Sequence, residues 1–237
     1  MNKKAIVVVS IGIRPWFSLA HKWMMSYASR YNYDLIVRDT PLCDLFSPSD
    51  FSRFQHYGRC QKIYIGSLFN DYDRVLQLDD TVFLSPLAPD LAEIVPSQCL
   101  GAWVEGERFS NGSKYLSQHQ KLYGLSEPMP KKRFYNNGVA LYSRAHQILF
   151  ESIDWKTIAK DESFPTGGYL SYKAYTNNIE IFDIGPRFNF VGSIIRRLKA
   201  FRPDVFFYHL TSGLNRQERS VVAEKLDIYF SHLEQAK

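Results

Sequence analysis

The sequence predicts a single α/β domain in which helices flank a mixed, mainly parallel central sheet. Residues 5–11 are β-branched and nearly all apolar, a pattern typical of a strand that is buried on both faces. Apolar side chains then recur at spacings of three and four between residues 17 and 31, which indicates an amphipathic helix. Residues 34–37 favour a second strand, so the chain opens as a right-handed βαβ unit of a parallel sheet.

The alternation of strands and helices weakens after residue 100, where strands and loops dominate. After a loop at 41–48, we expect helices at 52–68, 114–123 and 215–234, and strands at 74–78, 100–104, 139–142, 179–183 and 205–208. The last helix carries Val222, Leu226, Tyr229 and Leu233 on one face, which we expect to lie against the domain. No linker-like segment interrupts residues 1–237, so we predict one domain.

The composition is typical of a globular protein but does not identify its binding partner. The 237 residues are 45% hydrophobic, enough for a sizeable core, and the formal net charge is +5. A basic balance suits a phosphorylated ligand, nucleic acid or acidic lipid, although a solvated surface with surplus Lys and Arg explains it equally well. Basic residues are not interleaved with aromatic ones along one element, which argues against a nucleic-acid-binding module.

The cysteines and the hydrophobic runs indicate where the protein works. Cys43, Cys60 and Cys99 form no CxxC pair, so a structural zinc site is not expected. The apolar run at residues 5–11 is short for a signal-peptide core, and no segment reaches transmembrane length. We therefore expect a soluble, cytoplasmic protein with reduced thiols.

Two adjacent carboxylates, Asp79 and Asp80, follow directly on the strand predicted at residues 74–78. Ligands of open α/β sheets lie beyond the carboxyl ends of the strands, and two carboxylates there repel each other unless a cation lies between them. Mg²⁺ or Mn²⁺ would meet that need and would complete its shell with phosphate oxygens and water. The alternative is a plain turn in which one Asp caps a helix or bonds its own backbone.

The segment around this acidic pair is similar to a known enzyme family. Residues 72–84 read Tyr-Asp-Arg-Val-Leu-Gln-Leu-Asp-Asp-Thr-Val-Phe-Leu, which resembles the strand and Asp-x-Asp motif of GT-A glycosyltransferases. Residues 85–91 resemble the usual continuation, a Pro-marked turn into a short helix. The nearest likeness is to family 8-type enzymes, the group of glycogenin-like and lipopolysaccharide galactosyltransferases. It implies a Rossmann-like GT-A domain with a nucleotide-binding half at 1–105 and a sugar- and acceptor-binding half at 106–237.

Two segments that precede the acidic pair in the sequence are candidates for binding the nucleotide. Arg59 and Lys62 share a helix face where these enzymes place a basic residue toward the nucleotide, with a solvated face as the alternative. Ser10, Ile11 and Gly12 end the first strand and are candidates for the nucleobase pocket. Glycine there would let the backbone approach a flat ring closely, although a simple strand-to-loop turn would look the same.

Two downstream segments complete the likeness. Residues 135–139 resemble the "Phe-Asn-x-Gly-Val" segment that contacts the donor sugar, which implies roles for the residues at 136–138. These are Asn136, Asn137 and Gly138. Residues 208–213 resemble the late "His-x-x-Gly" segment, in which His209 would be a metal ligand and Thr211 and Gly213 would touch the pyrophosphate. Imidazole suits Mn²⁺ better than Mg²⁺, although a lone His after an apolar strand is more often simply a core residue.

The sequence departs from the family pattern in two places. In one alignment Asp79 is the first acid and Thr81 replaces the second; in the other, Asp80 is the second acid and Leu78 replaces the first. We therefore assign both Asp79 and Asp80 as metal ligands, with Asp80 slightly preferred. Leu78 is assigned to the binding site of the sugar-nucleotide donor. Residues 165–169 lack the "Asp-Gln-Asp" of family 8 enzymes, which leaves sugar specificity and stereochemical course open.

The resemblance implies a transferase that moves a sugar from a nucleotide-diphosphate sugar, preferably UDP-linked, to a glycan, glycolipid or glycoprotein. Asp79, Asp80 and Asn136 would be the catalytic group, with Mn²⁺ or Mg²⁺ as cofactor. If the reaction inverts configuration, a carboxylate must act as a general base and deprotonate the acceptor, and the candidates are Glu105, Glu107 and Asp161. A sugar nucleotidyltransferase and a catalytically silent GT-A domain remain as alternatives.

One basic cluster lies outside these motifs. Arg196, Arg197, Lys199 and Arg202 fall within seven residues of one another. Such a cluster is usually an exposed basic face, but it could hold the acceptor or contact an acidic membrane surface. The oligomeric state is left open by the sequence.

Overall fold

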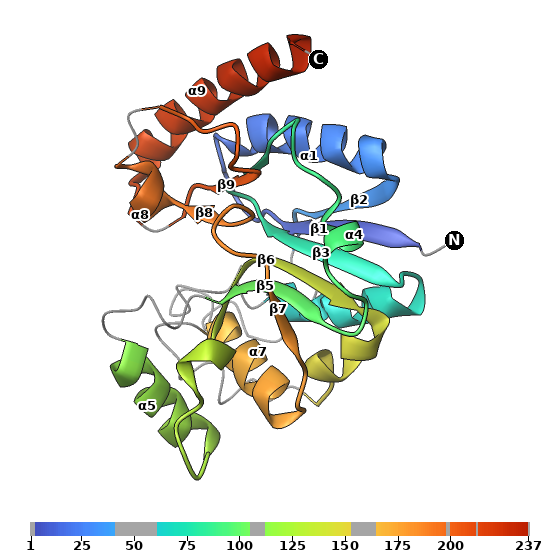
Figure 1. Ribbon diagram of the computed structural model, residues 1–237, viewed down its shortest axis with the longest axis vertical. Helices are drawn as coiled ribbons and strands as arrows, with labels where there is room; N and C mark the ends of the chain where they lie inside the picture. Colours follow the sequence, from blue (N-terminus) through green and yellow to red (C-terminus); the bar gives the residue numbers. More distant parts are fainter. Residues whose placement is uncertain are drawn as a thin grey trace.

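A computed structural model describes residues 3–40, 61–104, 112–152, 165–197, 200–211 and 213–236. Its centre is a six-stranded sheet with the order β2-β1-β3-β6-β5-β7 (Figure 1). The strands of this sheet are β1 (Lys4–Val9), β2 (Tyr33–Arg38), β3 (Arg74–Asp79), β5 (Leu100–Val104), β6 (Tyr135–Ser143) and β7 (Ile181–Asp183).

The opening βαβ unit has the predicted form. Helix α1 (Phe17–Tyr31) connects β1 to β2, and β1 pairs in parallel with both β2 and β3. Strand β6 is antiparallel to β3 and to β5, and β7 is parallel to β5. The prediction of a mixed, mainly parallel sheet flanked by helices is therefore confirmed.

A second sheet of three short strands has the order β4-β9-β8. It consists of β4 (Val82–Leu84), β8 (Phe190–Val191) and β9 (Phe207–His209). Strand β4 is antiparallel to β9, with Val82 opposite His209, and β8 is parallel to β9. Neither β4 nor β8 was expected, and the strand predicted at residues 205–208 begins later and ends at His209.

Helices cover both faces of the central sheet. Figure 1 shows α1 and α9 together on one side and α7 on the other. The helical segments after α1 are η1 (Gln61–Asn70), α4 (Leu91–Ile94), α5 (Gly112–Tyr123), η3 (Lys131–Arg133), η4 (Arg144–Phe150), α7 (Pro165–Thr176), α8 (Gly192–Ile195) and α9 (Arg216–Gln235). The described part of the helix predicted at 52–68 is the 3-10 helix η1, and α7 was not predicted at all.

Strand β3 shows why the central strands carry near-continuous apolar runs. Leu76 and Leu78 face the core beneath α1 and α9, where they join Trp23. Val75 faces the opposite core, where it joins Leu170 of α7. Because both faces are covered, consecutive residues of β3 are buried and only the end of the strand reaches the surface of the site.

Helix α9 is fixed to α1 by a charged anchor. Trp23 Nε1 and Lys22 Nζ both donate to Asp227 Oδ1, at 2.8 and 2.7 Å. We expect Asp227→Ala to lower the free energy of unfolding by about 1–3 kcal/mol, because the buried indole N–H would lose its acceptor. Urea denaturation would measure this. Glu224→Ala, at an exposed position of the same helix, should change stability by no more than about 0.5 kcal/mol; equal losses in the two variants would contradict the anchor.

A buried histidine gives the fold a pH dependence. His146 Nδ1 accepts from the backbone N–H of Ser143 at 3.0 Å, and Nε2 lies 3.2 Å from the carbonyl oxygen of Gln98. Burial lowers the pKa of His146, although the bond to Gln98 opposes this. The unfolded chain therefore binds a proton that the folded one excludes.

We expect stability to fall as pH drops below about 6.5, by at most about 1.4 kcal/mol per pH unit from this residue. Urea denaturation at pH 7.5 and 5.5 would measure it. Other groups also titrate in this range, so the readout is the difference from His146→Gln, which should lose less stability than the wild type on acidification. Identical pH slopes in the two proteins would rule out this contribution.

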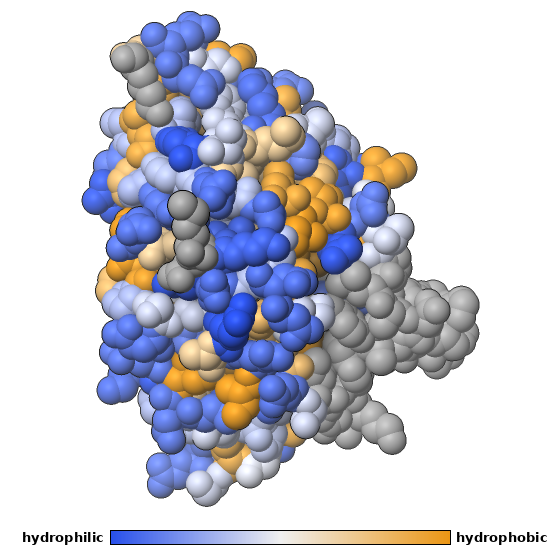
Figure 2. All heavy atoms as spheres, turned by 90° about the vertical axis from the view of Figure 1, so that its right-hand side faces the viewer, coloured by the Kyte–Doolittle hydropathy of each residue, from blue (hydrophilic) through white to orange (hydrophobic). Residues whose placement is uncertain are grey.

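The side of the molecule that faces the viewer in Figure 2 is mostly hydrophilic, with small hydrophobic groups between the polar side chains. Among the described residues, no helix combines the length and the apolar character that crossing a bilayer requires.

Candidate active site at the strand ends

The topology brings four distant segments together at the carboxyl end of β3. Val9 of β1 lies opposite Asp79, so the loop that follows β1 begins beside the acidic pair. Strand β6 runs antiparallel to β3 with Val139 opposite Leu78, which places Asn136, Asn137 and Gly138, in the first half of β6, at the same edge. The β4–β9 ladder then returns His209 to this edge. All four segments thus converge where open α/β sheets bind their ligands.

Asp79 contacts two basic groups. Its Oδ1 accepts a hydrogen bond from Lys62 Nζ, and its Oδ2 lies 3.1 Å from His209 Nε2. Burial disfavours the ionised carboxylate, but the Lys62 charge and the His209 contact outweigh it and hold the pKa of Asp79 well below its usual range. Asp79 is therefore a carboxylate throughout the physiological pH range.

Asp80 points to a different pair of partners. Its Oδ2 accepts from Arg14 Nε at 3.0 Å and from Ser10 Oγ at 3.4 Å. Burial and the neighbouring Asp79 charge raise the pKa of Asp80, and Arg14 offsets only part of this rise. Sequence reasoning missed Arg14, which sits in the loop after β1; its charge directly after the candidate nucleobase pocket was the available signal.

His209 is fully enclosed, and its ring contacts on two sides are polar. Its exposure is 1%, and Nδ1 lies 2.8 Å from Asn189 Oδ1 while Nε2 faces Asp79. Asn189 Nδ2 in turn donates to Asn136 Oδ1 at 3.0 Å, and the same oxygen accepts from the Gly138 backbone N–H at 2.9 Å. Asn189, which directly precedes β8, was not singled out from the sequence.

The donor set is suited to a hard divalent cation. An amide oxygen accepts hydrogen bonds only, so Nδ1 of His209 carries a hydrogen, and Nε2 is the ring nitrogen that faces Asp79 Oδ2. A proton or a cation between Nε2 and Oδ2 would satisfy both atoms. Within the described residues, however, no three His, Cys, Asp or Glu side chains are already grouped as metal ligands, because Asp80 is turned to Arg14.

Solved structures of known function share this architecture. The galactosyltransferase LgtC, in complex with donor and acceptor sugar analogues, aligns with a TM-score of 0.58 and 16% identity, over 98% of this chain and 95% of its own. This chain has the GT-A glycosyltransferase fold. No protein-family model and no curated protein matches the sequence.

Two other glycosyltransferase structures align at similar levels. A glycosyltransferase involved in the glycosylation of the major capsid of PBCV-1 gives a TM-score of 0.54 at 15% identity, over 92% of this chain and 99% of that one. The bifunctional glycosyltransferase WbbM, in its apo form, gives 0.57 at 14% identity, over 94% of this chain and 51% of its own. At such identities the likeness establishes the fold, and the chemistry has to be argued from the site.

Several residues predicted for donor binding lie at this edge of the GT-A domain. Ser10 is buried beside Asp80, Ile11 is half-buried, and Gly12 is exposed with φ of 82°, a conformation that favours glycine. Thr211 is half-buried, and its N–H donates to the His209 carbonyl at 2.8 Å. Their contacts with a nucleotide stay predictions.

Other predicted residues are placed differently. The Leu78 side chain is buried in the core beneath α1, so only its backbone faces the site edge. Gly213 is exposed with φ of 99°, and a Cβ there would lie 2.9 Å from the Ser193 backbone. Asn136 uses its carbonyl oxygen inside the protein, as described above. Arg59 and the three candidate bases Glu105, Glu107 and Asp161 lie outside the described residues.

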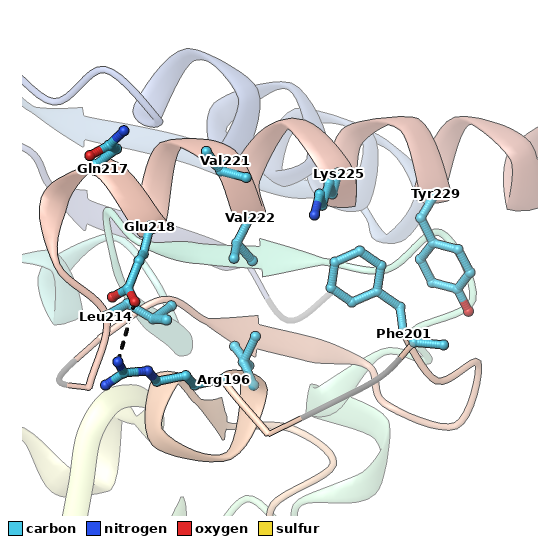
Figure 3. Close-up of a pocket in the computed structure, with 11 residues that line it drawn as sticks. Arg196, Phe201, Leu214, Gln217, Glu218, Val221, Val222, Lys225 and Tyr229 are labelled. Atoms are coloured by element: carbon cyan, nitrogen blue, oxygen red, sulfur yellow. Dashed lines mark ion pairs between the residues drawn. The ribbon is translucent and has the colours of Figure 1, made fainter.

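The basic cluster near residue 200 is partly neutralised by acids. Arg196 pairs with Glu218 at 3.6 Å and Arg202 with Asp204 at 2.7 Å, while Lys199 lies outside the described residues. Arg196 also borders a pocket of about 760 Å³ between α8 and α9 (Figure 3). Figure 3 shows both apolar and polar side chains of α9 along this pocket, among them Val222 and Lys225, and the pocket is separate from the acidic site.

Proposed function

We propose that this protein is a glycosyltransferase that moves a sugar from a nucleotide-diphosphate sugar to a hydroxyl acceptor. The observation that carries the proposal is the meeting of Asp79 and His209, which are 130 residues apart in sequence, at the strand ends of a GT-A fold. Neither side chain is needed there for the core, since each faces polar partners. The likeness of this fold to a galactosyltransferase solved with donor and acceptor sugar analogues supports the same assignment.

The second part of the proposal is that Asp79, His209 and Asp80 hold a divalent cation, Mn²⁺ or Mg²⁺. His209 Nε2 and the Asp79 carboxylate already face each other, and Asp80 would exchange Arg14 for the cation. A bound cation supplies a Lewis acid for the charge that grows on the diphosphate leaving group. Lys62 and Arg14 add fixed positive charge at the same edge, which stabilises an anionic leaving group further.

The sugar is oriented by the β6 edge. Asn137 Nδ2 is buried, and among the described residues none accepts a hydrogen bond from it. A buried donor without an acceptor is costly, and a sugar hydroxyl would satisfy it. The backbone oxygen of Asn137 is already occupied by Gln77 Nε2 at 2.5 Å. We prefer a UDP-linked donor and a glycan, glycolipid or glycoprotein acceptor, on the strength of the family resemblance.

A thermal-shift panel tests this function directly. UDP-, GDP- and dTDP-sugars are each added with and without Mn²⁺, and release of the nucleoside diphosphate is followed in parallel. A ligand that binds only the native state at 100 times its Kd stabilises it by about 2.7 kcal/mol. We expect one nucleotide class to raise the melting temperature, more so with Mn²⁺. Absence of a shift with every sugar nucleotide would refute the proposal.

A second function has one specific observation in its favour. Lys62 and Arg14 already neutralise the two carboxylates, which is what a metal-independent or catalytically silent GT-A domain would need. In that case a sugar nucleotide would raise the melting temperature equally with and without Mn²⁺. Nucleoside diphosphate release then separates a metal-independent enzyme, which turns over, from a silent domain, which does not.

A further inference from the structure

A chain of directed hydrogen bonds runs from the backbone of β6 to the imidazole of His209. It begins at the Gly138 N–H, which donates to Asn136 Oδ1 at 2.9 Å. A backbone N–H can only donate, so the Asn136 atom that it meets is the oxygen and not the nitrogen. The orientation of the Asn136 amide is therefore set by the strand itself.

The next hydrogen bond in this chain fixes the orientation of the Asn189 amide. The Asn136 oxygen also receives Asn189 Nδ2 at 3.0 Å, so the other end of the Asn189 amide is its oxygen. That oxygen lies 2.8 Å from His209 Nδ1, which must therefore be the donor. Exposure of Asn189 is 0% and of His209 1%, so no bulk water competes for these bonds.

We propose that Asn189 is a positioning residue: it accepts the hydrogen of His209 Nδ1, and so holds the imidazole with Nε2 toward Asp79. Asn136 orients Asn189 in turn, which gives the Asn136 side chain a positioning role in addition to any contact with the sugar. The consequence for a cation rests on the function proposed above. Outer partners of this kind typically change metal affinity 10- to 100-fold when they are removed.

The first experiment needs no cation. In metal-free protein labelled with ¹⁵N-histidine, two-bond ¹H–¹⁵N correlation at pH 7.5 reports which ring nitrogen of His209 carries hydrogen, with His209→Gln used for assignment. We expect hydrogen on Nδ1 in the wild type and loss of this preference in Asn189→Ala. Asn189→Asp, which keeps an acceptor for Nδ1–H, should restore it. A wild-type Nδ1 that carries no hydrogen would overturn the proposal even if the Ala variant failed to fold.

The second experiment measures Mn²⁺ binding by the loss of the free-ion signal in electron paramagnetic resonance. Asn189→Ala should raise the Kd about 10- to 100-fold, and Asn189→Asp should recover most of the affinity. Asn177→Ala is the matched control, because Asn177 donates to the Lys173 carbonyl at the far end of α7 and should leave the Kd unchanged. Unchanged tautomer and Kd in Asn189→Ala would overturn the proposal.

The two experiments separate this inference from the proposed function. If the wild type has the Nδ1–H tautomer, loses it in Asn189→Ala and yet binds no Mn²⁺, the positioning role stands and the cation site fails. If Mn²⁺ binds with equal Kd to the wild type and to Asn189→Ala, the cation site stands and the positioning role fails.

Discussion

Asp79→Asn is expected to abolish the Mn²⁺-dependent part of any shift in melting temperature caused by a sugar nucleotide. The substitution keeps the shape of the side chain but removes the charge that faces both Lys62 and His209. At saturating donor we expect the loss to be about 5–10 °C, the shift that about 2.7 kcal/mol of linked stabilisation produces in a chain of this size. Thermal melts with donor, with and without Mn²⁺, measure it.

The same variant should also unfold more easily without ligand. Lys62 is 6% exposed, and removal of its partner leaves a buried ammonium without a counter-charge, at a cost of about 3 kcal/mol. Lys62→Met combined with Asp79→Asn should therefore regain stability but not the Mn²⁺-dependent shift. Asp73→Asn, just before the start of the same strand, is the matched control and should keep the full shift. A full shift in Asp79→Asn would exclude Asp79 as a cation ligand.

Gly138→Ala is expected to displace the His209 ring and to remove the same Mn²⁺-dependent shift. A Cβ at position 138 would lie 2.1 Å from His209 Cε1 and within 2.9 Å of both ring nitrogens. The backbone of Gly138 has no positive φ, so alanine is penalised only by this contact. Because Asn189 and Asp79 hold the ring on its other sides, we expect a loss of about 1–3 kcal/mol in the free energy of unfolding, with loss of Mn²⁺ binding.

Two controls separate this contact from a general effect of alanine. A Cβ at Gly167 of α7 would meet Asn137 Oδ1 at an ordinary 3.5 Å, so Gly167→Ala should be neutral or stabilising, by up to about 1 kcal/mol. In a His209→Ala background the obstructing ring is gone, and Gly138→Ala should then cost almost nothing. An equal cost in both backgrounds would show that the ring is not the obstacle.

Local pattern predicted the elements that bury an apolar face. Residues 5–11, 17–31 and 74–78 were assigned correctly in type because their periods reflect burial, although β1 ends at Val9. Helix α7 was missed because Pro165 and two glycines look like breakers, whereas proline is well tolerated in the first turn of a helix. Strand β4 was missed because three residues are too few to show the alternation of side chains that marks a strand. Its pairing also depends on a partner strand more than a hundred residues away.

The residues of the candidate site also divide into those that the sequence predicts and those that only the structure reveals. The acidic pair and His209 each follow an apolar run in the sequence, and the family likeness predicts that they meet at one metal site. The structure adds Arg14 and Asn189, whose importance arises from contacts with Asp80 and His209 that no spacing in the sequence encodes. A polar side chain that acts through another residue leaves no local pattern.

The three-residue ladder between β4 and β9 also sets the order in which the protein becomes competent. During synthesis on the ribosome, both carboxylates emerge more than a hundred residues before the His209 imidazole that contacts Asp79. A chain that stops before residue 209 therefore carries the acidic pair without this imidazole. The contact between Asp79 and His209 can form only after the segment through residue 209 has emerged and docked.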